Sequence, residues 1–362
     1  MNEKAPLTIV VPTFNERANI RPLLEALDQN LSPGEWNIIF VDDDSPDDTA
    51  TEIRTCQADY SNVDLITRVG RRGLSSACIE GFHAATTPFI AVIDADLQHD
   101  ESVLMEMLSL LRKGKAEMVI GTRFSGAGGT GDGLSPLRKL VSQSATLLTR
   151  ALFRVKISDP MSGFFMMRRE VFTRVSQRLS AVGFKIMMDI IINHRPRLNI
   201  AEVPYTMRAR HQGESKLDSL VAIEYIAMLI SLRLGKLVSP GFVVFSAVGC
   251  TGLVVHATAL YLLVQIAQST FLVGQSIATL VAMTTNFFLN NAVTFRRKRL
   301  RGQAIFSGLF SFYLACSLGA IINLSISQFL YSVGVTYMAA GLFGALLAAV
   351  WNYLTTSQSI WR

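Results

Sequence analysis

The residues best suited to chemistry lie in the stretch FIAVIDADLQHD, residues 89–100. Apolar, β-prone residues lead directly into Asp94, Asp96 and Gln98, each two positions from the next. Side chains two apart on an extended segment point to the same side, so this spacing predicts that the two carboxylates converge. Neighbouring carboxylates repel one another unless a cation lies between them. We therefore expect a divalent cation at Asp94, Asp96 and Gln98.

Oxygen ligands of this kind suit Mg²⁺ or Mn²⁺, which keep water ligands and take others from phosphate groups. A sugar-bearing nucleoside diphosphate fits such a site, because the metal neutralises charge that develops on the departing diphosphate. The alternative is that one aspartate caps the next helix and the other is solvated. Two more polar motifs that follow strands, PTFNE at 12–16 and DDDSPDD at 42–48, favour the metal site.

Short β-prone runs alternate with helical segments in the first part of the chain. We expect strands at 7–13, 36–44, 63–69, 89–96 and 117–124. We expect helices between them at 15–31, 47–57, 75–86 and 101–114. Continuous apolar strands separated by helices predict a mostly parallel sheet covered on both faces, with ligands beyond the carboxyl ends of the strands. The glycine fingerprints of dinucleotide-binding and P-loop proteins are absent.

Charge is distributed unevenly along the chain. The protein has 34 Lys and Arg against 28 Asp and Glu. Every acidic residue lies before residue 237, and the first 236 residues carry 28 charges of each sign. The basic excess therefore belongs to the last third, a distribution that indicates membrane topology and argues against nucleic-acid binding. Four cysteines without C-x-x-C spacing and the lack of a leading signal segment predict a reducing, cytoplasmic location for the soluble part.

Two long runs, 237–295 and 302–361, contain no charged residue. Each is long enough for two membrane spans, because about 20 apolar residues cross a bilayer core of about 30 Å. We expect four transmembrane helices, near 240–266, 270–295, 303–330 and 336–360. The only charged loop between them is RRKRLR, residues 296–301. Since cationic loops stay in the cytoplasm, this loop predicts that the N-terminal part and the C-terminus are cytoplasmic as well.

The segment before the first span, 217–237, is apolar with few charges. It predicts helical structure at the membrane surface, or alternatively a buried helix of the soluble part. The polar residues within the spans are expected mainly to join helices to one another. They are His256, Asn286, Asn290, Asn291, Asn323 and Asn352.

An ordered set of motifs resembles the inverting family-2 glycosyltransferases of GT-A fold, in particular the dolichol-phosphate (polyprenol-phosphate) mannose synthases. The motifs are VVPTFNE, VDDDSPDDT, DADLQH, GTRF, SGFF, GFKI and RHQGESKL, spread over roughly residues 7–218. The membrane part, with TNFFLNNAVTF, is similar to GtrA-like four-helix domains. The resemblance implies a Rossmann-like GT-A domain at 1–216, a membrane-surface segment at 217–237 and a GtrA-like transmembrane domain at 238–362.

The resemblance also implies roles for individual residues. The nucleotide sugar would contact Pro12, Phe14, Glu16, Val41, Asp43, Asp94, Ala95 and Asp96. The metal would be held by Asp94, Asp96 and Gln98. The phosphate of the lipid acceptor would meet Arg123, Arg138, Ser142, Arg210 and Lys216, and the catalytic set would be Asp96, Arg123, Arg210 and Lys216. The family usually has a tyrosine where this chain has Phe14, so the stacking surface is kept and the hydroxyl is lost. Pro12 and Val41 could also be plain loop and strand residues. Asp42 and Asp44 could cap the next helix.

The implied activity is the transfer of mannose from GDP-mannose to dolichyl or polyprenyl phosphate, with inversion, at the cytoplasmic face of the membrane. A phosphate monoester is mostly a dianion at neutral pH and can attack without a general base, so none is expected. Alternatives are a glucosyltransferase that uses UDP-glucose and a component of a flippase for lipid-linked sugars. A processive polysaccharide synthase is disfavoured because its usual Q-x-x-R-W motif is absent.

Overall fold

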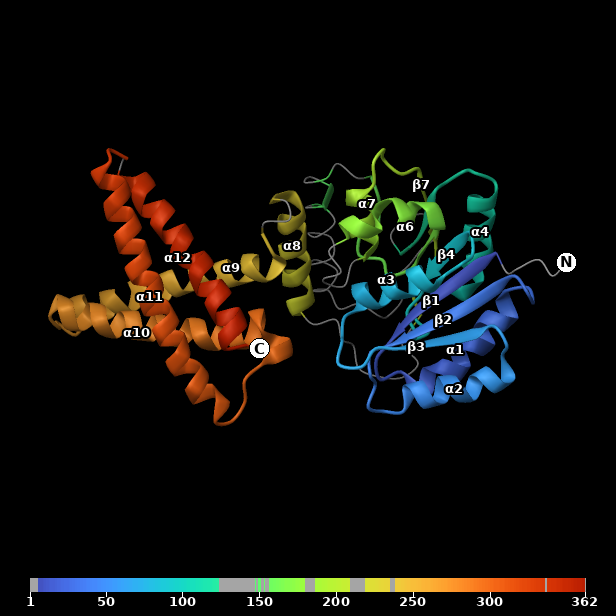
Figure 1. Cartoon of the computed structure of the whole chain (residues 1–362), viewed down its shortest axis with the longest axis horizontal. Helices are drawn as coiled ribbons and strands as arrows, with labels where there is room; N and C mark the ends of the chain where they lie inside the picture. The colour runs from blue at the N-terminus through green and yellow to red at the C-terminus, as the bar shows by residue number, and fades with distance from the viewer. Residues whose placement is uncertain are drawn as a thin grey trace. The chain divides into compact units, whose positions relative to one another are not determined.

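The computed structural model of the protein describes residues 6–123, 147, 149–150, 153, 156–179, 186–208, 219–234, 238–335 and 337–361. The chain divides into two compact units, Met1–Arg233 and Leu234–Arg362 (Figure 1). The predicted acceptor residues Arg138, Ser142, Arg210 and Lys216 lie outside the described residues. The same holds for the Gly-rich stretch 128–135.

The first unit is built on a mixed sheet that has seven strands among the described residues, in the order β3-β2-β1-β4-β6-β5-β7. The strands are β1 (Leu7–Thr13), β2 (Trp36–Asp42), β3 (Val63–Thr67), β4 (Phe89–Val92), β5 (Met118–Thr122), β6 (Phe165–Arg168) and β7 (Ile200–Pro204). Strand β6 runs antiparallel to its neighbours β4 and β5, and all other pairs are parallel. The predicted α/β, mostly parallel sheet is confirmed.

Helices cover both faces of the sheet, which explains why its strands are apolar without alternation. One layer consists of α1 (Arg17–Asn30), α2 (Thr49–Asp59) and α4 (Leu104–Arg112), and the other of α3 (Leu74–Ala84), α6 (Arg169–Val175), α7 (Ile186–Asn193) and α8 (Ser219–Leu234). Within β1, Ile9 and Val11 join the core of the first layer while Val10 joins the second. Figure 1 shows α1 and α2 lying along the sheet.

The strand that leads to the aspartates is shorter than predicted. β4 ends at Val92, and Asp94 and Asp96 lie in the turn that follows, where Leu97 has a φ of +61°. The expectation that both carboxylates extend from one continuous strand is therefore wrong. Their positions are set by the turn and by the side chains around it.

The segment after residue 218 contributes helix α8 to the first unit. Tyr225, Met228 and Leu229 of this helix are buried in the core of the second layer. The hydroxyl groups of Tyr225 and Thr149 lie 2.7 Å apart within that core. One face of α8 therefore packs as a domain helix, and its location at a membrane surface stays a prediction.

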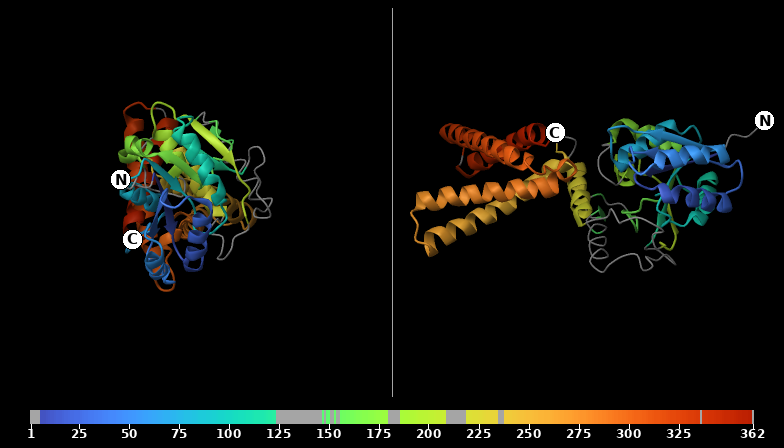
Figure 2. Two further views of the ribbon diagram at one scale, coloured as in Figure 1. Left: turned by 90° about the vertical axis from the view of Figure 1, so that its right-hand side faces the viewer. Right: turned by 90° about the horizontal axis from the view of Figure 1, so that it is seen from below.

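The second unit consists of long apolar helices: α9 (Pro240–Tyr261), α10 (Phe271–Leu289), α11 (Ala304–Ser332) and α12 (Tyr337–Ser359). They pack as two hairpins, α9 with α10 and α11 with α12 (Figures 1 and 2). Helix α9 starts with Pro240 after Ser239, whose Oγ accepts a hydrogen bond from the Phe242 amide at 3.1 Å. Among the described residues, Pro240–Ile266 and Ala304–Ile322 are long and apolar enough to cross a membrane.

The two hairpins repeat the same close contact. Gly252 of α9 faces Asn286 of α10, and Gly319 of α11 faces Asn352 of α12. A Cβ on Gly252 would lie 2.3 Å from the Asn286 amide, and one on Gly319 would lie 2.2 Å from that of Asn352. The glycines thus allow an asparagine to pack against the neighbouring helix, as expected for polar residues that join apolar helices.

Candidate active site

The acidic motif DDDSPDD, residues 42–48, forms the turn after β2. Asp42 is fully buried, and its Oδ1 accepts hydrogen bonds from the hydroxyls of Thr13, at 3.1 Å, and Ser45, at 2.6 Å. Its Oδ2 accepts from the Ser45 amide at 3.0 Å. Asp42 therefore joins the ends of β1 and β2.

The start of α2 is stabilised by a different aspartate from those predicted. Asp47 accepts hydrogen bonds from the amide of Thr49, at 3.1 Å, and from its hydroxyl. Asp44 is exposed and has a φ of +58°. The interpretation of Asp42 and Asp44 as caps of this helix is wrong, because Asp47 lies where the side chain can reach the first helical amide.

Asp43 anchors the loop between β3 and α3. Its Oδ1 lies 2.9 Å from Nε of Arg68, and its Oδ2 accepts a hydrogen bond from the Gly73 amide at 2.7 Å. Both side chains are buried. Burial raises the pKa of the Asp43 carboxyl, against the opposite effects of the Gly73 amide and Arg68. Asp43 therefore holds residues 68–73 beside the carboxyl ends of β1 and β2.

This loop carries a cation over the predicted stacking residue. The guanidinium carbon of Arg72 lies 4.4 Å from the centroid of the Phe14 ring, a cation–π contact. Sequence reasoning did not single out Arg72, because nothing in its local pattern links it to a residue so far back in the chain. A nucleotide base that stacked on the Phe14 ring would therefore lie next to the guanidinium group of Arg72.

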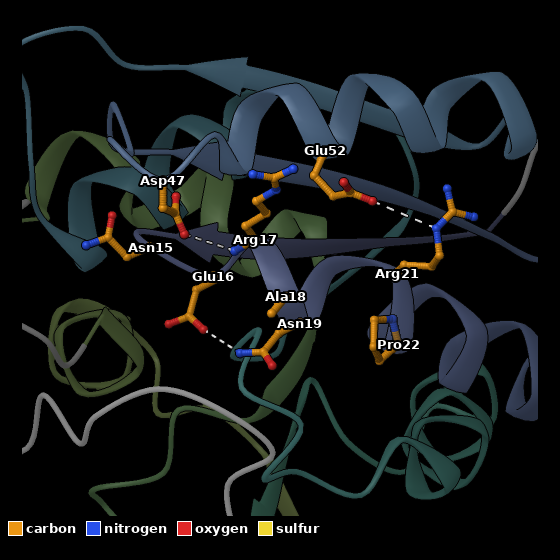
Figure 3. Close-up of a pocket in the computed structure, with 9 residues that line it drawn as sticks. All are labelled: Asn15, Glu16, Arg17, Ala18, Asn19, Arg21, Pro22, Asp47 and Glu52. Carbon is orange, nitrogen blue, oxygen red and sulfur yellow. Dashed lines mark hydrogen bonds and ion pairs between the residues drawn. The ribbon is translucent and has the colours of Figure 1, made fainter.

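A cavity of about 590 Å³ opens beside the first turn of α1 (Figure 3). It is lined by Asn15, Glu16, Arg17, Ala18, Asn19, Arg21, Pro22, Asp47 and Glu52. Of the predicted nucleotide contacts only Glu16 lines it, and the Glu16 Oε2 accepts a hydrogen bond from Asn19 at 2.8 Å. Phe14, Asp43 and Asp94 are not part of its wall, so this cavity is not the predicted donor site as a whole.

The two aspartates after β4 have different surroundings. Asp94 is partly exposed, whereas Asp96 is buried. Asp96 Oδ1 accepts a hydrogen bond from the main-chain amide of Gln98 at 3.2 Å. Gln98 Nε2 donates to the Arg208 carbonyl at 3.2 Å, which fixes the orientation of the Gln98 side chain. Ala95, between the aspartates, is buried in the core.

Two other predicted nucleotide contacts belong to the strands. Val41 is fully buried in β2 and joins the core, so any contact with a nucleotide runs through its main chain. Pro12 is partly exposed near the end of β1, where it pairs in register with Val41. Both residues pack as ordinary strand residues, which is the alternative to direct nucleotide contact that the sequence left open.

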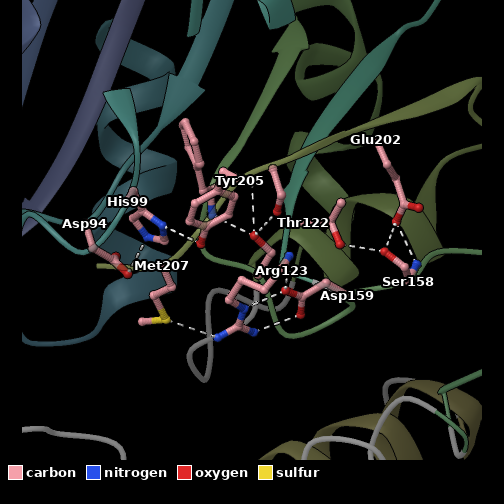
Figure 4. Close-up of polar contacts among 12 residues, drawn as sticks. Asp94, His99, Thr122, Arg123, Ser158, Asp159, Glu202, Tyr205 and Met207 are labelled. Carbon is pink, nitrogen blue, oxygen red and sulfur yellow. Dashed lines mark hydrogen bonds and ion pairs between the residues drawn. The ribbon is translucent and has the colours of Figure 1, made fainter. Parts of the chain in front are cut away.

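His99 supports Asp94 from within the protein (Figure 4). Its Nε2 lies 3.2 Å from Oδ2 of Asp94, and its Nδ1 lies 2.8 Å from the hydroxyl of Tyr205. His99 is 4% exposed, and its ring centroid lies 5.1 Å from that of Phe164. Sequence reasoning gave His99 no role, since a histidine beside a motif is often solvated and its partner Tyr205 lies beyond β7.

Arg123 is held by an aspartate that was also missed. Its Nε donates to Asp159 Oδ2 at 2.7 Å and its Nη2 to Asp159 Oδ1 at 2.9 Å, while Nη1 faces the Met207 sulfur at 3.7 Å (Figure 4). Asp159 is fully buried. Burial opposes the charged form of Arg123, yet its pKa is raised because the hydrogen bonds and charge of Asp159 outweigh burial. Arg123 is thus a charged, oriented group.

The SGFF motif fastens β5 to β6 and leaves room for Asp94. Ser162 Oγ donates to the Gly121 carbonyl at 2.7 Å, and a Cβ on Gly121 would meet the Phe164 ring. A Cβ on Gly163 would lie 3.0 Å from Asp94 Oδ2. Glycine at 163 therefore permits the close approach of backbone and carboxylate.

Arg208 ties the segment after β7 to the loop after β4. Its Nη1 donates to Glu101 at 2.6 Å, its Nη2 to Asp100 at 2.9 Å, and its main-chain amide to the Gln98 carbonyl at 2.9 Å. The chain continues from here towards Arg210 and Lys216, which lie outside the described residues.

The oxygen atoms of the Asp94, Asp96 and Gln98 side chains fit a hard cation. In the part of the chain that the structure describes, no group of three or more His, Cys, Asp or Glu side chains is arranged to hold a metal. Two carboxylates and one amide oxygen, from Asp94, Asp96 and Gln98, nonetheless suit a cation that completes its coordination with water and phosphate oxygens. The chemistry of these residues therefore agrees with Mg²⁺ or Mn²⁺.

Comparison with known proteins identifies both units. Residues 8–176 match the model for glycosyl transferase family 2, and residues 244–361 match that for the GtrA/DPMS transmembrane domain. A GT-A-like sheet with acidic side chains beyond its strands, joined to this helical domain, defines a membrane-bound glycosyltransferase.

Similarity to individual proteins shows which family of glycosyltransferases the chain belongs to. The chain is 34% identical over 361 residues to a dolichol-phosphate mannosyltransferase of Pyrococcus furiosus, across 98% of this chain and 99% of that protein. The dolichol-phosphate mannosyltransferase of Mycosarcoma maydis is 36% identical, over 62% of this chain and 78% of that protein. The one of Saccharomyces cerevisiae is 32% identical, over 66% of this chain and 91% of that protein. The protein belongs to the dolichol-phosphate mannosyltransferase family.

A solved structure resembles part of the chain more distantly. Glucosyl-3-phosphoglycerate synthase of Mycobacterium tuberculosis, in complex with Mn²⁺, UDP and glucosyl-3-phosphoglycerate, is 21% identical, with a TM-score of 0.48. The match covers 63% of this chain and 80% of that one.

Proposed function

We propose that the protein transfers mannose from GDP-mannose to a polyprenyl phosphate such as dolichyl phosphate, with inversion at the anomeric carbon. The observation that carries this proposal is the end-to-end similarity to the mannosyltransferase of Pyrococcus furiosus, which spans both units. The surroundings of Asp94, Asp96 and Arg123 support it, because two carboxylates and an oriented guanidinium lie beyond the carboxyl ends of the central strands.

On the donor side, Asp94, Asp96 and Gln98 would hold Mg²⁺ or Mn²⁺. Bound there, the cation would neutralise negative charge on the leaving diphosphate. Phe14 and Arg72 offer a stacked ring and guanidinium for the nucleotide, and Asp43 keeps the loop of Arg72 in place. These residues bind and orient the donor so that its anomeric carbon faces the acceptor.

On the acceptor side, the attacking phosphate is a dianion at neutral pH and needs no general base. Arg123 is already paired with the buried Asp159, so it contributes directed N–H donors rather than net positive charge. The net charge that binds the phosphate must come from other cations. Arg138, Arg210 and Lys216 are the proposed source of this charge, and Ser142 would donate a hydrogen bond from its hydroxyl.

We further propose that the catalytic domain spans 1–216, that 217–237 lies at the membrane surface, and that all four helices of 238–362 cross the bilayer. The basic loop at 296–301 would then face the cytoplasm together with the catalytic domain. Cysteine labelling tests this arrangement: in Gly302→Cys, the introduced thiol should react from the cytoplasmic side alone, and its reaction from the opposite side would overturn the arrangement.

The donor is tested by offering the purified full-length protein radiolabelled GDP-mannose or UDP-glucose, with polyprenyl phosphate and Mn²⁺. The expected result is lipid-linked label from GDP-mannose. Label from UDP-glucose alone would replace the mannosyltransferase with a glucosyltransferase on the same site. Lipid-linked label from neither donor would overturn the proposal.

A further inference from the structure

His99 occupies an enclosed position behind the proposed metal site. It is 4% exposed and lies between two oxygen atoms, Oδ2 of Asp94 at 3.2 Å and the hydroxyl of Tyr205 at 2.8 Å (Figure 4). The ring of Phe164 packs against both His99 and Tyr205, at 5.1 and 5.5 Å between ring centroids. These contacts restrict rotation of the imidazole, so its two nitrogens have fixed partners.

The partners decide where the imidazole carries its proton. An ionised carboxylate only accepts hydrogen bonds, so Nε2 must carry a proton to bond with Asp94. In the neutral ring Nδ1 is then an acceptor, and the hydroxyl of Tyr205 can donate to it. Burial raises the pKa of Tyr205, so this hydroxyl keeps its proton. The result is a directed chain from Tyr205 through His99 to Asp94.

We propose that His99 is a positioning residue that fixes the Asp94 carboxylate for the cation and the sugar diphosphate. Histidine–carboxylate hydrogen bonds outside the ligand shell orient metal ligands in this way, and their loss commonly weakens metal affinity about 10- to 100-fold. Asp94 needs such support because its side chain is partly exposed and lies beyond the end of β4, outside the hydrogen-bonded strand. The inference rests on the proposed function, since it assumes that Asp94 holds a metal.

The test measures Mn²⁺ binding to the full-length protein with GDP present, by electron paramagnetic resonance of the free ion. In His99→Phe the ring remains and the donor is lost, so Mn²⁺ affinity should fall about 10- to 100-fold. In His99→Gln an amide N–H takes the place of the Nε2 donor, and most of the affinity should return. Tyr205→Phe removes one hydroxyl and should weaken binding about two- to tenfold.

His194 provides a matched control. It is 1% exposed, so it is as buried as His99, and its Nδ1 lies 2.7 Å from the Pro196 carbonyl rather than beside Asp94. His194→Phe should bind Mn²⁺ like the wild type. Should His99→Phe fail to fold, as judged by thermal unfolding, Tyr205→Phe decides the question.

Three outcomes separate the inference from the proposed function. Wild-type Mn²⁺ affinity in folded His99→Phe, or in Tyr205→Phe if the first variant does not fold, would overturn the role of His99 and leave the metal site standing. An equal loss in His194→Phe would show general destabilisation and also overturn it. A wild-type protein that binds no Mn²⁺, or an Asp96→Ala variant that binds it normally, would overturn the metal site itself and with it the role of His99.

Discussion

Arg123 and Asp159 meet through two parallel hydrogen bonds, from Nε to Oδ2 at 2.7 Å and from Nη2 to Oδ1 at 2.9 Å. The pair joins the residue after β5 to the segment before β6, inside the protein. Such bidentate geometry gives a guanidinium a fixed orientation, which a lone surface arginine lacks. Arg123 therefore depends on a residue 36 positions away for its place in the site.

The first prediction concerns this pair. Asp159→Ala leaves Arg123 charged, buried and without its carboxylate, so the free energy of unfolding should fall by about 3–5 kcal/mol. Thermal or denaturant unfolding of the full-length protein measures the change. Glu170→Ala is the control, because it breaks an exposed pair with Arg174 at 3.9 Å and should shift stability by less than about 0.5 kcal/mol. Equal stability of the two variants would contradict the prediction.

The second prediction uses the raised pKa of Asp43. A carboxyl whose pKa is higher in the folded protein than in the unfolded chain binds its proton more tightly when folded. Its contribution to stability is then complete below the unfolded pKa of about 3.9, and is lost as the pH rises through the folded pKa. Asp43→Asn removes this titration.

The melting temperature of the wild type minus that of Asp43→Asn should consequently increase as the pH is lowered from 7 towards 4. Parallel thermal scans of the two proteins give this difference directly. A difference that shrinks on acidification would mean that Arg68 and Gly73 dominate over burial, and the sign of the predicted shift would be wrong.

The third prediction concerns the contact between α9 and α10. Gly252→Ala places a Cβ 2.3 Å from the Asn286 side-chain amide, so this side chain must give up its position or the helices must move apart. Overpacking of this kind costs about 1–3 kcal/mol, which should lower the melting temperature in detergent or nanodiscs. Gly249→Ala, one turn earlier on the same helix, adds a Cβ that meets nothing within 4 Å and should not destabilise. Identical melting of the two variants would refute the close contact.

Much of the architecture could be predicted because local patterns determine it. The uninterrupted apolar runs of β1 and β2 reflect a sheet covered on both faces, and the uncharged runs after Leu237 yield the helices α9 to α12. The end of β4 was placed too late, because apolar residues followed by Asp-Ala-Asp fit a strand as well as a turn. Only the backbone, with Leu97 at a φ of +61°, distinguishes the two.

The supporting residues of the site could not be predicted from local patterns. Asp159 contacts Arg123 across 36 positions, Tyr205 contacts His99 across 106, and Arg208 contacts Glu101 across 107. A sequence motif shows which residue types are present, whereas these pairs exist only once β5, β6 and β7 lie side by side. Motifs identified the residues expected to touch substrate, and the fold supplied those that hold them in position.

The most direct test of the central claim is mannose transfer from GDP-mannose to polyprenyl phosphate by Asp96→Ala, with Asp28→Ala as control. Asp96 is nearly buried beside the proposed cation, whereas Asp28 is exposed on α1. The account predicts that Asp96→Ala forms no lipid-linked mannose while inserting into membranes and melting like the wild type, and that Asp28→Ala is fully active. Normal turnover by Asp96→Ala would contradict the account.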